Sequence, residues 1–160
     1  MKHARIAWAG AIHDAIEADG QLELLTPAFK GRRVGFDEVV WLPPLAPMPA
    51  HRPRTILALG LNYADHAKEL EFKAPEEPLV FIKGEGTLTG HRQKTRRPPG
   101  VTFMHYECEL TAVIGKTARY VEKAAAMDHV AGYALHNDYS EREWQLERGG
   151  QWVKGKSFDT

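Results

Sequence analysis

The segment from His105 to Lys116 reads H-Y-E-C-E-L-T-A-V-I-G-K and alternates between two kinds of side chain with a period of two. That period predicts a β-strand, because successive side chains of a strand point to opposite faces. Glu107 and Glu109 then share one face, about 6.6 Å apart from two rises of ~3.3 Å. The other face is apolar, and Cys108 on it is expected to be a small core residue. The carboxylate pair predicts either an exposed polar face or oxygen ligands for Mg²⁺, Mn²⁺ or Ca²⁺.

Composition excludes several classes of partner. Of 160 residues, 43% are hydrophobic and 26% are charged, as in an ordinary globular protein. Lys plus Arg equals Asp plus Glu at 21 each, so no net charge attracts nucleic acid or an anionic membrane. No apolar run approaches ~18 residues, and the first twenty residues lack the apolar stretch of a signal peptide. We therefore expect a cytoplasmic protein without nucleic-acid or membrane partners.

The order of the segments predicts an α+β, strand-rich fold in two parts. Residues 1–50 predict a small N-terminal domain of short strands, and prolines between residues 43 and 53 mark a linker. Residues 51–160 predict the main domain. Its expected strands are 55–61, buried on both faces, 79–82 and 133–135. Its expected helices follow Asp65 and cover residues 121–131 and 140–147, the last opened by a Ser140–Glu143 capping box.

Two further features of the main domain suggest catalytic chemistry. His66 and Glu69 are three residues apart, so on a helix they share a face and could form a general-base pair or an ordinary surface pair. Lys83 ends the expected strand 79–82 next to glycines. It could reach a ligand carboxylate or be a plain surface lysine.

Five sequence segments, taken in their order along the chain, together resemble a known protein family. They read G-L-N-Y-A-D-H-A-K-E (60–69), P-L-V-F-I-K (78–83), H-Y-E-C-E-L (105–110), G-Y-A-L-H-N-D-Y-S-E-R (132–142) and G-K-S-F-D-T (155–160). From about Arg54 onward the chain resembles the fumarylacetoacetate hydrolase family. The resemblance implies a β-roll that forms homodimers. It also implies that the roll continues beyond residue 160, so the chain is expected to be an incomplete catalytic domain, a fragment or a split subunit.

The resemblance also implies roles for eight residues, each matched position by position, and Lys83 is added to them from its place at the end of a strand. A divalent ion, Mg²⁺ or alternatively Mn²⁺ or Ca²⁺, is expected on three carboxylates. Cationic and amide groups are expected to bind an oxo-dicarboxylate substrate, and other residues to move protons. The implied metal ligands are Glu107, Glu109 and Asp138, the substrate-binding residues Lys83, Arg142 and Gln145, and the catalytic residues His66, Glu69 and Lys156.

The implied activity is that of aromatic-compound catabolism. Residues 54–133 resemble the branch that isomerises and decarboxylates intermediates of homoprotocatechuate (4-hydroxyphenylacetate) breakdown. Its substrates are 2-oxo and 2-hydroxy-dienoate dioic acids, which react through a metal-bound enolate. The segment W-Q-L-E-R-G-G-Q-W-V-K-G-K-S-F-D-T is closer to hydrolase and lyase members, so an acylpyruvate-type C–C hydrolase is the alternative. The sequence also leaves open a catalytically incomplete fragment and a non-enzymatic metal-binding sensor.

Overall fold

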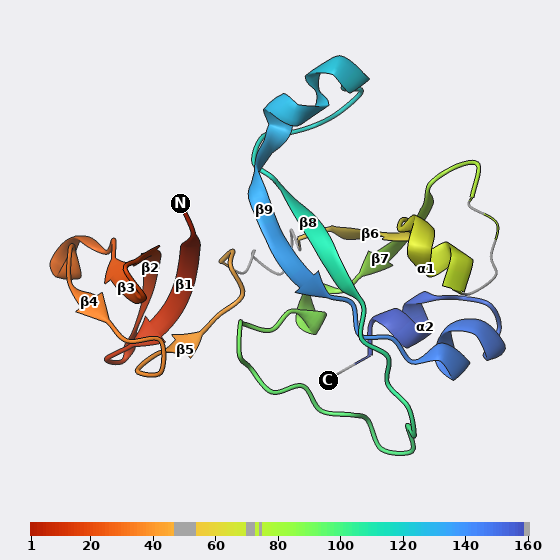
Figure 1. Cartoon of the computed structure of the whole chain (residues 1–160), viewed down its shortest axis with the longest axis horizontal. Coiled ribbons are helices and arrows are strands. Elements are labelled where there is room, and N and C mark those ends of the chain that lie inside the picture. Colours follow the sequence, from red (N-terminus) through yellow and green to blue (C-terminus); the bar gives the residue numbers. More distant parts are fainter. Residues whose placement is uncertain (47–53, 70–72, 74, 159–160) are drawn as a thin grey trace. The chain divides into compact units, whose positions relative to one another are not determined.

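The computed structural model describes residues 1–46, 54–69, 73 and 75–158, with the backbone alone at positions 66 and 69 (Figure 1). The described residues form two compact units, residues 1–96 and residues 97–158. The predicted linker prolines at 47, 49 and 53 lie outside the described residues. The predicted domain boundary at residue 50 therefore stays a prediction.

The first unit begins with a five-stranded antiparallel sheet in the order β4-β3-β2-β1-β5 (Figure 1). Its elements are β1 (His3–Trp8), β2 (Ala11–Ala18), β3 (Gln21–Leu24), the 3₁₀ helix η1 (Pro27–Phe29), β4 (Arg33–Val34) and β5 (Val40–Trp41). Two-residue turns, Ala9-Gly10 and Asp19-Gly20, join the first three strands. All four turn residues have positive φ, which fits the twist of a β-hairpin and favours glycine at the second position.

The core of this sheet is made of aliphatic side chains on one face. Ile6, Ala15, Leu22, Leu24 and Val34 are at most 3% exposed. Burying a leucine or isoleucine side chain contributes roughly 1.5–3 kcal/mol, so the short strands at the N-terminus have a core of their own.

The first unit also contains a two-stranded hairpin, β6 (Ile56–Gly60) paired with β7 (Leu79–Lys83). The helix α1 (Ala64–Glu69) follows β6, and the 3₁₀ helix η2 (Glu85–Thr87) follows β7. The prediction that residues 55–61 are buried on both faces is wrong, because Leu57 and Leu59 are exposed. They lie opposite Ile82 and Val80, so one face of this hairpin is an exposed apolar strip.

The second unit is built on an antiparallel pair, β8 (Cys108–Ile114) with β9 (Val130–Asn137) (Figure 1). The 3₁₀ helix η3 (Lys123–His129) connects them, and the π-helix η4 (Glu143–Glu147) and the helix α2 (Val153–Lys156) follow. The predicted helix 121–131 is therefore wrong in type and extent. Three central alanines favour a helix, but Val130 already pairs with Ile114, and that cross-strand pairing prevails over local propensity.

The two faces of the β8–β9 pair have opposite character. Glu109, Thr111 and Val113 are half-buried, whereas Cys108, Leu110, Ala112 and Ile114 are exposed. Leu110 (62% exposed) lies directly opposite Leu135 (82% exposed). The expectation that Cys108 belongs to the core is wrong, because in the described residues the apolar face, not the carboxylate face, is the exposed one.

The strand-rich α+β class predicted from the sequence is confirmed by these elements. Among the described helices, none has both the length and the apolar character needed to cross a membrane.

Candidate metal centre

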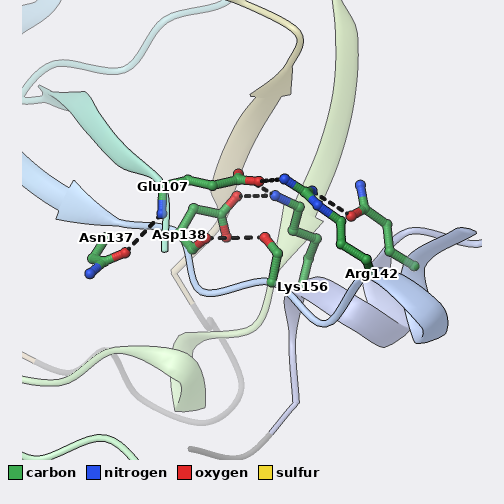
Figure 2. Close-up of polar contacts among 7 residues, drawn as sticks. Glu107, Asn137, Asp138, Arg142 and Lys156 are labelled. Atoms are coloured by element: carbon green, nitrogen blue, oxygen red, sulfur yellow. Dashed lines mark hydrogen bonds and ion pairs between the residues drawn. The ribbon is translucent and has the colours of Figure 1, made fainter. Parts of the chain in front are cut away.

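The carboxylates meet where the β8–β9 pairing continues past the end of the strands. The Asp138 N–H donates to the Glu107 carbonyl oxygen at 2.8 Å. The Glu107 N–H donates to the Asn137 side-chain oxygen at 3.1 Å (Figure 2). One step further, His105 and Ser140 exchange two backbone hydrogen bonds of 2.8 and 3.0 Å. This ladder fixes Glu107 opposite Asp138, although they are 31 positions apart in the sequence.

The three predicted ligands form one cluster. Glu107, Glu109 and Asp138 each offer a carboxylate oxygen, and these atoms lie within 4.8 Å of one another. Asp138 is fully buried, and the two glutamates are half-buried. At 4.8 Å two carboxylates repel each other by about 3.5 kcal/mol at an effective dielectric constant of 20, so the cluster needs positive charge.

The donor set fits a hard divalent cation. Carboxylate oxygens are the ligands that Mg²⁺, Mn²⁺ and Ca²⁺ take, and the cluster offers no thiolate or imidazole among its three members. Opposed oxygens around Ca²⁺ are about 4.6–5.2 Å apart, and those around Mg²⁺ about 4.2 Å. The 4.8 Å limit on the separation of the three oxygens is therefore comparable with the width of either coordination sphere.

Two cations lie against the same carboxylates (Figure 2). The Lys156 ammonium donates to Glu107 Oε2 at 2.5 Å and to Asp138 Oδ2 at 2.9 Å. The Arg142 guanidinium donates to Glu107 Oε1 at 2.5 Å. Lys156 is only 3% exposed, so its charge acts in a poorly solvated environment.

The helix that carries Arg142 holds it in place. Arg142 Nη1 donates to the Gln145 side-chain oxygen at 2.8 Å, and Gln145 is buried (Figure 2). Gly155, next to Lys156, packs directly on this helix, and its carbonyl oxygen accepts the Glu141 N–H at 2.9 Å. A Cβ on Gly155 would lie 2.3 Å from the Glu141 carbonyl oxygen, so only glycine permits this approach. Close packing of α2 on η4 therefore brings Lys156 and Arg142 to one cluster.

The predicted capping box is wrong in its residues. The Ser140 hydroxyl donates to the Asp138 carbonyl oxygen at 3.1 Å instead of capping a helix. The side chain of Glu141 takes the capping role, since it accepts the Trp144 N–H at 2.6 Å. Ser140 is drawn away because it belongs to the ladder that begins at His105.

His105 is a titratable side chain near the cluster, and its pKa is lowered from its ordinary value. Burial lowers its pKa, repulsion from Arg142 adds to the effect, and the nearby Glu107 carboxylate opposes it. The lowered pKa favours the neutral form of the His105 imidazole.

Three of the nine predicted site residues belong to the other unit. His66 and Glu69 both lie in α1, three residues apart, and only their backbone is described. Lys83 ends β7 and is 5% exposed, so the alternative of a plain surface lysine is wrong. The catalytic roles of the first two and the substrate-binding role of Lys83 stay predictions.

Sequence reasoning did not predict that three further polar residues support the cluster. Asn137 accepts the Glu107 N–H, Ser140 binds the Asp138 carbonyl oxygen, and Glu141 caps η4. All three lie within three residues of Asp138, in the sequence segment N-D-Y-S-E-R. A polar run directly after an expected strand was the signal that could have found them.

Comparison with known proteins shows which family the chain belongs to. The family model described as fumarylacetoacetate (FAA) hydrolase C-terminal matches residues 55–160. The homoprotocatechuate catabolism bifunctional isomerase/decarboxylase of Escherichia coli is 59% identical over 98 residues, which are 61% of this chain and 23% of that protein.

Solved structures match over the whole chain. The 5-carboxymethyl-2-hydroxymuconate delta-isomerase of Mycobacterium smegmatis superposes with a TM-score of 0.80 at 32% identity, covering 100% of this chain and 62% of that one. The 2-hydroxyhepta-2,4-diene-1,7-dioate isomerase of Mycobacterium marinum gives 0.78 at 28% identity, with 100% and 62% covered. The chain thus spans about a quarter of the curated relative and less than two thirds of either solved structure. The predicted fold type is confirmed, and the chain belongs to the fumarylacetoacetate hydrolase family.

Proposed function

We propose that this chain carries the metal centre of a divalent-metal-dependent enzyme that acts on 2-oxo or 2-hydroxy-dienoate dioic acids by isomerisation or decarboxylation. The observation that carries the proposal is the cluster of Glu107, Glu109 and Asp138, with ligand atoms within 4.8 Å of one another and two cations beside them. The names of the Escherichia coli and Mycobacterium relatives supply the substrate class.

The charges of the cluster suit an anionic substrate. Three carboxylates and a divalent ion leave one net negative charge, and Lys156 and Arg142 turn it into one net positive charge. A bound cation of this kind polarises a carbonyl and offsets the negative charge of an enolate. A dioic acid adds carboxylates, for which a guanidinium offers a bidentate partner.

The residues of the chain then have separate tasks. Glu107, Glu109 and Asp138 would hold the ion, and Arg142, aligned by Gln145, would bind and orient a substrate carboxylate. Lys156, buried beside them, would stabilise negative charge that develops on the substrate. Lys83 is proposed to bind substrate, and His66 with Glu69 to move protons.

The test begins with metal binding and then follows turnover. Mn²⁺ titration monitored by electron paramagnetic resonance should show one bound ion. Mg²⁺ or Mn²⁺ should then support loss of the ultraviolet absorbance of 5-carboxymethyl-2-hydroxymuconate or 2-hydroxyhepta-2,4-diene-1,7-dioate, and EDTA should abolish it. Glu109→Gln should lower Mn²⁺ affinity at least tenfold, whereas the matched control Glu122→Gln, on an exposed residue, should not. A chain that binds no Mn²⁺ and converts neither compound contradicts the proposal.

A C–C hydrolase of the acylpyruvate type is the second candidate. It is favoured by the H-x-x-E spacing of His66 and Glu69 within one short helix, since hydrolysis needs a group that activates water. Product analysis with an acylpyruvate separates the two candidates. Hydrolysis releases two carboxylic acids, whereas isomerisation keeps every carbon in one product and decarboxylation removes only carbon dioxide.

The proposal also includes the oligomeric state of the enzyme, its location in the cell and the source of its substrate. We expect a homodimer in the cytoplasm that takes a small oxo-dicarboxylate from aromatic catabolism. Size-exclusion chromatography with light scattering tests the dimer directly.

A further inference from the structure

The described cluster already contains a positive charge bonded to two of the three carboxylates. The Lys156 ammonium bridges Glu107 Oε2 and Asp138 Oδ2, at 2.5 and 2.9 Å (Figure 2). We propose that Lys156 is an internal counterion: it holds the carboxylates together before metal binds, and an incoming divalent ion must take their oxygens from it. This inference rests on the metal centre of the proposed function.

Burial makes such a counterion necessary. Asp138 is fully buried and Lys156 is 3% exposed, so water cannot stabilise either charge well. Removing either partner would leave the other as an unpaired buried charge, which strongly destabilises the folded protein. The metal-free fold should therefore depend on Lys156 much more than on an ordinary surface lysine.

Geometry makes the ammonium and the ion competitors. An ion held by the oxygens that now accept from Lys156 would lie within about 5 Å of its nitrogen, given metal–oxygen distances of about 2.1–2.5 Å. Two cations at that separation repel each other strongly in a poorly solvated site. Binding of the ion therefore weakens or breaks the two hydrogen bonds of Lys156, and no covalent bond changes.

Arg142 does not duplicate this role. It donates to Glu107 Oε1, whereas Lys156 donates to Glu107 Oε2, and it also donates to Gln145. It is 23% exposed by its side chain, so it keeps more contact with water than Lys156. Glu107 thus accepts from both Arg142 and Lys156, and the Lys156 ammonium links Glu107 to Asp138.

The decisive comparison is Lys156→Met against Lys154→Met. Both remove one positive charge from α2, but Lys154 is exposed and donates to the Arg148 carbonyl oxygen at 2.7 Å, away from the carboxylates. We expect Lys156→Met to bind Mn²⁺ at least tenfold more tightly than the wild type, measured by electron paramagnetic resonance of free Mn²⁺. In EDTA its thermal midpoint should fall by several degrees, and saturating Mn²⁺ should restore it. Lys154→Met should match the wild type in all three measurements.

The outcomes separate this inference from the proposed function. If wild type binds Mn²⁺ but Lys156→Met binds it equally or more weakly, the counterion inference is wrong and the metal centre stands. If neither protein binds Mn²⁺, the metal centre itself is wrong, and the inference with it. If Lys156→Met binds more tightly but is as stable as wild type in EDTA, Lys156 does not hold the metal-free site, which also overturns the inference. Should Lys156→Met fail to fold in EDTA, Lys156→Gln, which keeps an N–H donor without the charge, provides the same comparison.

Discussion

Replacement of Gly155 by alanine tests how the cluster is supported, because the added Cβ has no room. It would lie 2.3 Å from the Glu141 carbonyl oxygen and 2.6 Å from the Gln145 backbone nitrogen, whereas ordinary contacts begin at 3.4 Å. The α2 and η4 backbones must therefore separate by about 1 Å. Overpacking of this kind costs typically 1–3 kcal/mol. Loss of the Glu141–Gly155 hydrogen bond adds about 1 kcal/mol, so we expect the free energy of unfolding to fall by about 2–4 kcal/mol.

Urea denaturation followed by circular dichroism measures this loss. With a slope of about 1–3 kcal/mol per molar urea, the midpoint should fall by roughly 1 M or more. Gly132→Ala is the matched control in the same unit, because a Cβ there meets nothing within 4 Å. A Gly155→Ala protein as stable as Gly132→Ala would refute the close packing of α2 on η4.

Three other changes test separate features. Arg142→Lys should raise the KM for a dioate about tenfold. The planar guanidinium can donate to Glu107 and to a second partner at once, whereas an ammonium lacks this fork of donors. An unchanged KM would contradict the substrate-binding role of Arg142. Glu141→Ala should lower the free energy of unfolding by about 0.5–2 kcal/mol through loss of the Trp144 cap, and urea denaturation would show no shift if the cap contributed nothing. Cys108 is exposed, so the folded chain should release one equivalent of thionitrobenzoate from Ellman's reagent within minutes, and protection of the thiol would show that its face is covered.

The part of the site that could be predicted from sequence is the part set by strand period. Alternation around Glu107 and Glu109 predicted one shared carboxylate face, and the structure places both beside Asp138. That third carboxylate came from the family resemblance, since no local pattern joins positions 107 and 138. The roles of these residues stay predictions until metal binding is measured.

The errors come from places where tertiary pairing prevails over local preference. Three alanines at 124–126 favour an α-helix, but cross-strand pairing begins at Val130 and leaves only a 3₁₀ helix. Ser140 fits a capping box by sequence, but its ladder with His105 turns the hydroxyl toward a carbonyl oxygen. Which face of β8 is exposed also cannot be read from alternation, because the pattern separates the faces without saying what covers them.

The register of β8 against β9 has a consequence for any length change in these strands. Apart from a register shift between Val113 and Ile114, the residues of the two strands pair one to one, for example Glu109 with His136 and Leu110 with Leu135. Inserting one residue directly before Glu109 would shift the register of one part of the strand by one position. Every side chain in that part would then point to the opposite face, so Leu110 would take the face that Glu109 now occupies. Inserting two residues would restore the facing but carry Glu109 about 6.6 Å along the ladder. The number of residues between Glu107 and Glu109 must therefore stay constant. Natural variation in this part of β8 should occur by substitution and not by insertion.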